Sequence, residues 1–145
     1  MKFLKFFEAE LYISENMLEE ALRIYVVLKD KSNLNLSLLM ATGNCYLKLK
    51  NYKYALPEFE TALKIDPHNS PAWHGKGICL MQTKKYEEAI DAFLSAVDLT
   101  YQYPLAHLSL GVGLVLLVVH LAVIALDEER QDVALPQRGP DQDRD

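Results

Sequence analysis

The feature that most constrains the fold is a set of residues that recurs three times at a fixed spacing of 34. In the range 70–103 the set is Trp73, Gly77, Leu80, Ala89, Phe93 and Ala96. The residues 34 earlier are Leu39, Gly43, Tyr46, Ala55, Phe59 and Ala62, and those another 34 earlier are Lys5, Ala9, Tyr12, Ala21, Tyr25 and Leu28. A fixed period of this length indicates stacked copies of one supersecondary unit. We therefore divide this part of the chain into units at 2–35, 36–69 and 70–103.

Each unit divides into two amphipathic helices on local grounds. In the third unit, Ser70 is a good N-cap and Pro71 suits the first turn, where its missing N–H is not needed. The polar run 83–85 interrupts the apolar periodicity and predicts the turn between the two helices. Pro67 disfavours helix at the residue before it, and so predicts the end of the preceding helix. Gly77 falls where two helices of a hairpin have to approach closely.

The period and its residues resemble the tetratricopeptide repeat. The second unit matches best, with Gly43, Tyr46, Ala55, Phe59, Ala62 and Pro67, whereas the first departs from the pattern at Lys5, Glu8 and Asn33. The resemblance implies an all-α, right-handed helical-hairpin solenoid of three such units plus an atypical fourth helical unit. It also implies that the first helix of each unit lines a concave groove, which this family commonly uses to hold a peptide or another protein.

The fourth unit, predicted at 104–126, begins in register and then departs from it. Pro104 repeats the role of Pro71 and Gly111 repeats Gly77, but no polar turn follows. Residues 108–126 are almost entirely apolar, and the acidic tail 127–145 carries three arginines against seven acids, with two prolines. Such a tail buries too little to offset its ordering entropy, so we predict disorder there.

The apolar segment 108–126 has two readings that the sequence leaves open. It is close to the roughly 20 residues that span a bilayer core of about 30 Å, which favours a membrane anchor, although no Lys or Arg lies close on its N-terminal side. Alternatively, it is an unusually apolar helix that caps the solenoid, since terminal repeats are often atypical. A misread or truncated coding frame, affecting 117–145, is compatible with either. An apolar surface of this kind also favours self-association.

Charge and cysteine content restrict the partners. Residues 1–104 carry 12 basic and 13 acidic side chains, without a basic stripe, which argues against binding nucleic acid. The two cysteines, Cys45 and Cys79, have no metal-ligand spacing and do not make a disulfide framework. We therefore expect a reducing, cytoplasmic location, or a membrane-anchored protein with the repeats in the cytosol.

No group of residues predicts catalysis, and we expect no enzyme activity, cofactor or metal. The four histidines are scattered and form no ligand pair of helical spacing. Glu87 and Glu88 begin a helix, where acids complement the positive end of the helix dipole. Cys45 and Cys79 occupy equivalent places in their units and are predicted to fill small buried gaps.

The predicted binding site is the groove lined by the first helix of each unit. By resemblance, its residues are Phe3, Phe6, Phe7, Glu10, Met40, Asn44, Leu47, His74, Ile78 and Met81. Some members of the family hold the C-terminal carboxylate of chaperone tails with Lys, Arg and Asn. Carried over by position, those residues would be Phe6, Glu10 and either Pro71 and Gly75 or Leu105 and Leu108, so that clamp is absent.

The predicted function is a non-enzymatic scaffold or adaptor. Its groove, rich in Phe, Met and Ile, should prefer a protein segment that makes apolar contacts, with Asn44 available to a peptide backbone. The alternatives are a membrane-anchored adaptor, with 108–126 as a C-terminal transmembrane helix, and a regulatory part of a larger multidomain protein.

Overall fold

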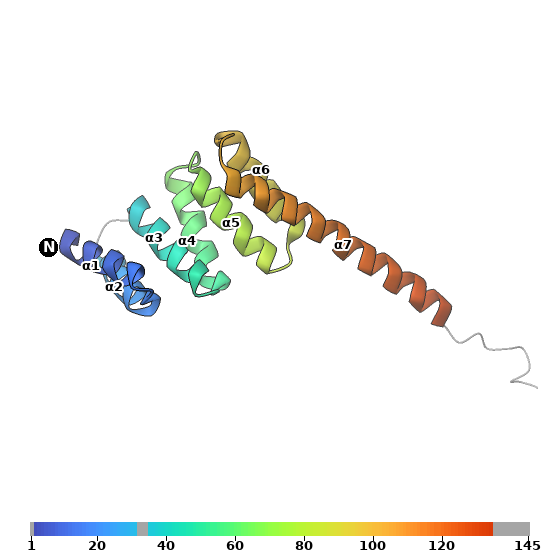
Figure 1. Ribbon diagram of the computed structural model, residues 1–145, viewed down its shortest axis with the longest axis horizontal. Helices are drawn as coiled ribbons and strands as arrows, with labels where there is room; N and C mark the ends of the chain where they lie inside the picture. The colour runs from blue at the N-terminus through green and yellow to red at the C-terminus, as the bar shows by residue number, and fades with distance from the viewer. Residues whose placement is uncertain (1, 32–34, 135–145) are drawn as a thin grey trace, which may run out of the picture.

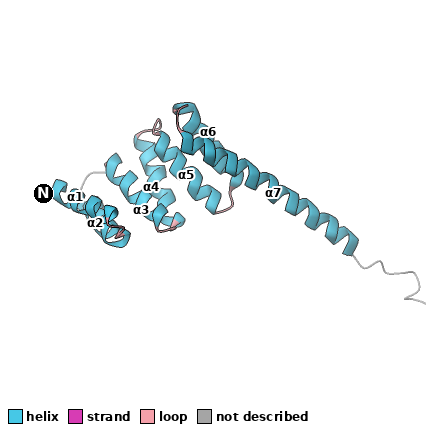
Figure 2. Cartoon of the chain, viewed as in Figure 1, coloured by secondary structure: helices cyan, strands magenta, loops and turns pink. Residues whose placement is uncertain are grey.

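The computed structural model describes residues 2–31 and 35–134, and within these ranges the secondary structure is entirely helical. The helices in chain order are α1 (Lys2–Ser14), α2 (Leu18–Lys31), α3 (Leu36–Lys48), α4 (Tyr52–Ile65), α5 (Ser70–Gln82), α6 (Tyr86–Leu99) and α7 (Pro104–Ala134). Helices α1 to α6 stack side by side as three hairpins, and α7 extends away from the stack (Figure 1). A short loop joins the two helices of each hairpin (Figure 2). The predicted all-α helical-hairpin solenoid is confirmed.

The three hairpins share one kind of turn. Asn16, Lys50 and Lys84, each 34 residues apart, have φ values of 62°, 58° and 65°. In the third turn the Lys85 N–H donates to the Leu80 carbonyl at 2.9 Å and the Lys84 N–H to the Met81 carbonyl at 3.1 Å. This pair of bonds is the Schellman motif, in which a left-handed residue closes the C-terminus of a helix. Each of the ranges 2–35, 36–69 and 70–103 holds one hairpin; their boundaries as repeat units stay a prediction.

Small residues let the two helices of a hairpin approach closely, as the sequence predicts. A Cβ atom on Gly77 would lie only 2.4 Å from Cε1 of Phe93, and one on Gly43 only 2.9 Å from Cζ of Phe59. Both phenylalanine rings are fully buried. Because ordinary carbon–carbon contacts are about 3.5–4.0 Å, these two positions admit no side chain without rearrangement.

One helix cap differs from the prediction. Asn69, rather than Ser70, is the N-cap of α5, and its side chain accepts a hydrogen bond from the Ala72 N–H at 2.9 Å. Ser70 lies inside the helix, and its hydroxyl bonds the Thr100 hydroxyl at 2.6 Å. Asparagine and serine cap helices about equally well, so adjacent candidates are separated only by tertiary contacts. The predicted end of α4 before Pro67 agrees with the structure, since α4 ends at Ile65.

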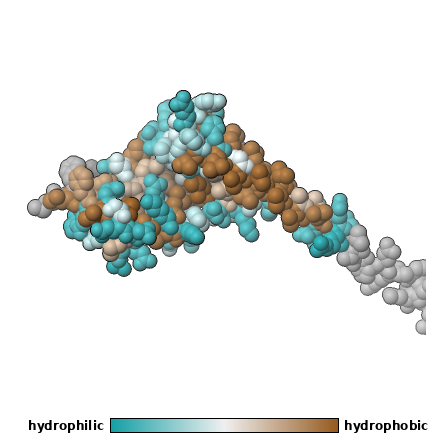
Figure 3. All heavy atoms as spheres, viewed as in Figure 1, coloured by the Kyte–Doolittle hydropathy of each residue, from teal (hydrophilic) through white to brown (hydrophobic). Residues whose placement is uncertain are grey.

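Helix α7 is longer than predicted. Its first part packs against α6 and α5, and the helix then continues without interruption to Ala134. The helical residues 127–134 differ from the predicted disorder, because Glu, Arg and Gln in this stretch are good helix formers that extend an existing helix at little cost. The rest of the predicted tail, 135–145, lies outside the described residues. Figure 3 shows the apolar surface continuing along α7 until polar residues near its far end.

Candidate peptide-binding face

The first helices of the second and third hairpins form the central part of the predicted groove. Helix α3 lies beside α5, and α5 lies beside α7, whereas α1 packs mainly on α2 and shares a core cluster with the side of α3 that includes Leu38 and Cys45. The predicted groove residues that the structure brings together are therefore those of α3 and α5, which we call the α3–α5 face. They are Met40, Asn44, Leu47, Ile78 and Met81.

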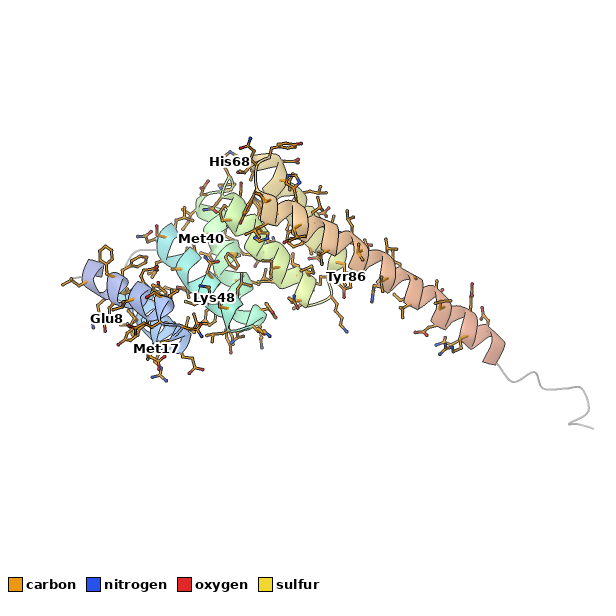
Figure 4. The ribbon with its side chains drawn as sticks, viewed as in Figure 1. Glu8, Met17, Met40, Lys48, His68 and Tyr86 are labelled. Carbon is orange, nitrogen blue, oxygen red and sulfur yellow. The ribbon has the colours of Figure 1, made fainter. Side chains whose placement is uncertain are left out.

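The α3–α5 face is apolar and partly accessible. Met40 and Leu47 are half-buried and pack against the core cluster around Phe59, and Figure 4 marks Met40 on α3. Ile78 and Met81 are half-buried in the same way against the cluster around Phe93. A half-buried thioether is held by the core at one end and can adapt to a ligand at the other. This arrangement suits contact with another apolar surface.

Asn44 supplies the polar group of this face. Its side chain is exposed, and it lies one helical turn from both Met40 and Leu47 on α3. An amide side chain carries two N–H donors and a carbonyl acceptor, so it can bond both backbone groups of an extended segment. The face thus offers apolar contact with one adaptable polar anchor.

His74, predicted as a groove residue, is instead part of the contact between α5 and α7. The side chain is only 9% exposed. Its Nε2 lies 2.9 Å from the Ser109 hydroxyl of α7, and its Nδ1 lies 3.3 Å from the Tyr103 hydroxyl. Burial lowers the pKa of His74 below its usual 6.5. Helix α7 covers His74, so the residue helps to hold that helix in this structure, and a role for it in ligand binding stays a prediction.

Tyr103 and Ser109 are the residues that the sequence reasoning missed at this contact. The rings of Tyr103 and Phe93 lie 5.2 Å and 5.8 Å from the His74 ring, centroid to centroid. Ser109 is one of the few polar residues in an otherwise apolar stretch, which was an available signal for a specific partner.

The predicted groove residues of α1 do not join the α3–α5 face. Phe6 is half-buried and packs on the Tyr25 ring of α2 at 5.7 Å between centroids. Glu10 accepts a hydrogen bond from the Tyr25 hydroxyl, and burial together with this carboxylate raises the pKa of Tyr25. Phe7 is 67% exposed. Phe3 belongs to α1, but its side chain lies outside the described residues.

The His, Cys, Asp and Glu side chains of the described residues are dispersed. Throughout residues 2–31 and 35–134, no three His, Cys, Asp or Glu side chains are grouped so as to hold a metal ion. Cys45 and Cys79 are both buried free thiols, as their equivalent positions predict. Burial raises the pKa of Cys79 to about 12 and that of Cys45 above 9, so both thiols stay protonated at neutral pH.

Comparison with known proteins supports the same family. The sequence profile of the tetratricopeptide repeat matches residues 46–110. This match assigns the tetratricopeptide repeat to residues 46–110, which run from the last turn of α3 to the first part of α7. The Hsp70-Hsp90 organising protein of Plasmodium falciparum (isolate 3D7) is 25% identical over 93 residues. That alignment covers 64% of this chain but only 16% of the relative, so the chain matches a small part of that protein.

Two solved structures carry the same fold. The first tetratricopeptide domain of Spaghetti (RPAP3), bound to the HSP90 peptide SRMEEVD, superposes with a TM-score of 0.76 at 19% identity, covering 81% of this chain and 93% of that one. The second tetratricopeptide domain of human RPAP3, in complex with the HSP70 peptide SGPTIEEVD, gives 0.71 at 20% identity, covering 78% and 98%.

Proposed function

We propose that this protein is a non-enzymatic adaptor that binds an apolar protein segment on the α3–α5 face. The observation that carries the proposal is the group of half-buried apolar side chains around the exposed Asn44. Binding a segment there would complete the burial of Met40, Leu47, Ile78 and Met81. Burying apolar surface contributes roughly 25 cal/mol per Å², and Asn44 would fix the backbone of the segment. The proposed setting is the cytosol.

The chemistry of the face distinguishes its ligand from those of the two solved relatives. Those domains hold peptides that end in the acidic sequence EEVD. In this chain, the positions that the family resemblance assigns to a carboxylate clamp hold Phe6 and Glu10. A carboxylate at Glu10 repels an acidic tail, and a phenylalanine supplies no cation. We therefore propose an apolar segment, and not an acidic C-terminus, as the ligand.

A selection from a library of short peptides tests this proposal. The wild-type chain should enrich apolar peptides, and their affinity, measured by titration calorimetry, should exceed that for SRMEEVD. The double variant Met40→Glu/Ile78→Glu should weaken binding at least about tenfold, or about 1.4 kcal/mol, because two carboxylates would meet an apolar ligand.

The matched control places the same charges on the second helices. Tyr54 in α4 and Leu94 in α6 are 55% and 42% exposed, so Tyr54→Glu/Leu94→Glu adds two acids without entering the α3–α5 face. Far-UV circular dichroism checks that both double variants stay helical. Equal binding by wild type and Met40→Glu/Ile78→Glu, or a preference for SRMEEVD, would disprove the proposed site.

A second candidate function, a membrane-anchored adaptor, is favoured by one property of α7. The range Pro104–Asp132 is long and apolar enough to cross a bilayer by length and composition, and only 6% of its most apolar window is buried. A span of about 20 residues that ends before Asp127 would have to include Ser109 and Gly113. Both residues lie against the third hairpin, so anchoring requires that α7 leave it.

Carbonate extraction of membranes separates this candidate from the first. An integral anchor stays in the pellet, and release of the protein into the supernatant would exclude a transmembrane α7. Binding of apolar peptides at the α3–α5 face is independent of that result.

A further inference from the structure

Gly111 of α7 lacks the aromatic neighbour that its two repeat equivalents have. Gly43 and Gly77 lie 68 and 34 residues earlier and are covered by the rings of Phe59 and Phe93. A Cβ atom on Gly111 would meet nothing within 4 Å. In the first two cases the ring belongs to the second helix of the same hairpin. Helix α7 has the register of a first helix, but no second helix of the described chain covers Gly111.

The uncovered position is the floor of a shallow apolar depression of about 490 Å³. Its walls are side chains of α7 itself: His107, Leu108, Val112, Val115 and Leu116. No Lys, Arg, Asp or Glu occurs between 104 and 126, so the surroundings of the depression are uncharged. Its shape and chemistry fit an aromatic ring carried on an apolar helix face, as Phe93 is carried on α6.

Helix α1, at the other end of the solenoid, has an apolar face that is also uncovered. Leu4, Phe7 and Leu11 are 70%, 67% and 57% exposed. In each of the next two hairpins, the equivalent residues are largely buried against the hairpin that comes before. The equivalents are Leu38, Ala41 and Cys45 in α3, and Ala72, Gly75 and Cys79 in α5. A Cβ atom on Gly75, for example, would lie 2.5 Å from Phe59 of α4. The face of α1 is therefore a hairpin-stacking surface that no other hairpin covers within residues 2–31 and 35–134.

The two uncovered faces match in spacing and are opposite in shape. Leu4, Phe7 and Leu11 follow i, i+3, i+7 along α1, and Leu108, Gly111 and Val115 follow the same spacing along α7. Both stripes are about 10 Å long at 1.5 Å per residue. The large central residue of one stripe, Phe7, corresponds to the absent side chain of the other, Gly111.

We propose that α1 of one copy docks on α7 of a second copy, with Phe7 over Gly111. The Phe7 ring then takes the place that Phe59 has over Gly43 and Phe93 has over Gly77. The contact joins different faces of the two copies, so it is heterologous, and each added copy leaves one face of each kind free for a further copy. The chain consequently forms open, head-to-tail assemblies whose length increases with protein concentration.

Two single variants of the full chain test this assembly. Phe7→Glu puts a charge on the α1 face and keeps α7 intact, and Gly111→Trp fills the depression and keeps α1 intact. Phe7 is exposed, and a side chain added at Gly111 would point into open space, so both variants should keep the fold. Far-UV circular dichroism checks this. In analytical ultracentrifugation, the mass of the wild type should increase with concentration beyond that of a dimer. Each variant alone should be monomeric, with the assembly constant weakened at least about tenfold.

The mixture of the two variants gives the decisive result. Phe7→Glu still offers α7, and Gly111→Trp still offers α1, so an equimolar mixture should form a one-to-one dimer and stop there. Leu94→Glu and Met40→Glu/Ile78→Glu should assemble like the wild type, which separates this contact from the α3–α5 face.

Four outcomes would overturn the proposal. The first is a wild type that is monomeric at all concentrations, and the second is a mixture of variants that stays monomeric. The third is a wild-type dimer that Phe7→Glu leaves intact, because that result would indicate pairing of α7 with α7. The fourth is flotation of the wild type and Phe7→Glu alike with phosphatidylcholine vesicles while both are monomeric in buffer, which would assign the α7 surface to lipid.

Discussion

Gly77 and Gly111 occupy the same repeat position, yet replacing each with alanine should change stability in opposite directions. Both lie inside helices, where alanine is favoured over glycine by about 1 kcal/mol. At Gly111 nothing lies within 4 Å of the new Cβ atom, so this preference acts alone. We expect Gly111→Ala to raise the free energy of unfolding by about 0.5–1 kcal/mol.

At Gly77 the new methyl group would overlap a ring that has no room to move. Its Cβ atom would lie 2.4 Å and 2.5 Å from two carbon atoms of Phe93, about 1 Å closer than an ordinary contact allows. Phe93 is fully buried and lies against the His74 ring. Overpacking of this kind costs about 1–3 kcal/mol, which exceeds the helix preference, so Gly77→Ala should lower stability by up to about 2 kcal/mol.

Urea unfolding followed by far-UV circular dichroism, at low protein concentration, measures both effects. The two variants should differ by about 1–3 kcal/mol, or several degrees in melting temperature for a chain of this length. Gly77→Ala should lower the free energy of unfolding less in a Phe93→Leu background than in the wild type, because the smaller side chain leaves space for the methyl group. If both alanine variants are equally stabilised, the close approach of Gly77 to Phe93 does not limit the packing.

Three further predictions concern a turn, a histidine and an ion pair. Lys84→Gly should stabilise the protein by about 0.5–1 kcal/mol in the same unfolding assay, because glycine adopts the left-handed φ of 65° without steric cost; a loss of stability would contradict this. Burial lowers the folded-state pKa of His74, so its contribution to stability is present above about pH 6.5 and is lost as the pH falls from there towards the folded-state pKa. His74→Gln should therefore flatten the decrease in melting temperature below pH 6.5, and an unchanged decrease would refute this role. Lys29 of α2 pairs with Glu58 of α4, which is 8% exposed and whose Oε2 has no hydrogen-bond partner among the described residues. Lys29→Met should therefore lower the free energy of unfolding by about 1–3 kcal/mol, and a further Glu58→Met should recover most of this loss. No recovery in the double variant would contradict the ion-pair explanation.

The contacts that the sequence predicts correctly are those set by the repeat period. A spacing of 34 places Gly43 and Gly77 at the same point of two hairpins, and the structure finds a phenylalanine ring against each. The same period predicts the burial of Cys45 and Cys79. These predictions succeed because equivalent positions in stacked repeats have equivalent neighbours. The alignment of the repeats is then enough to predict which residues are in contact.

The repeat period predicts contacts less well where the next repeat is missing from the described chain. His74 has the position of a groove residue, but the chain that follows its hairpin is α7, and Ser109 of that helix bonds it. Phe7 has a stacking position in α1, where no preceding hairpin of the described chain covers it. At the ends of a solenoid the neighbours are no longer those of the period, so register alone does not determine what a side chain contacts.

The two proposals for α7 use the same apolar surface, but one keeps the first part of the helix packed on the third hairpin and the other removes it. Head-to-tail assembly uses the outer stripe at Gly111 and leaves Ser109 bonded to His74. A bilayer span of about 20 residues removes Ser109 and Gly113 from the third hairpin and exposes the ring of Phe93, which is fully buried in the structure. It also breaks a hydrogen bond to a buried imidazole, which then lacks that partner. The state of His74 therefore distinguishes the two: assembly keeps the imidazole buried with its lowered pKa, and insertion returns that pKa towards 6.5.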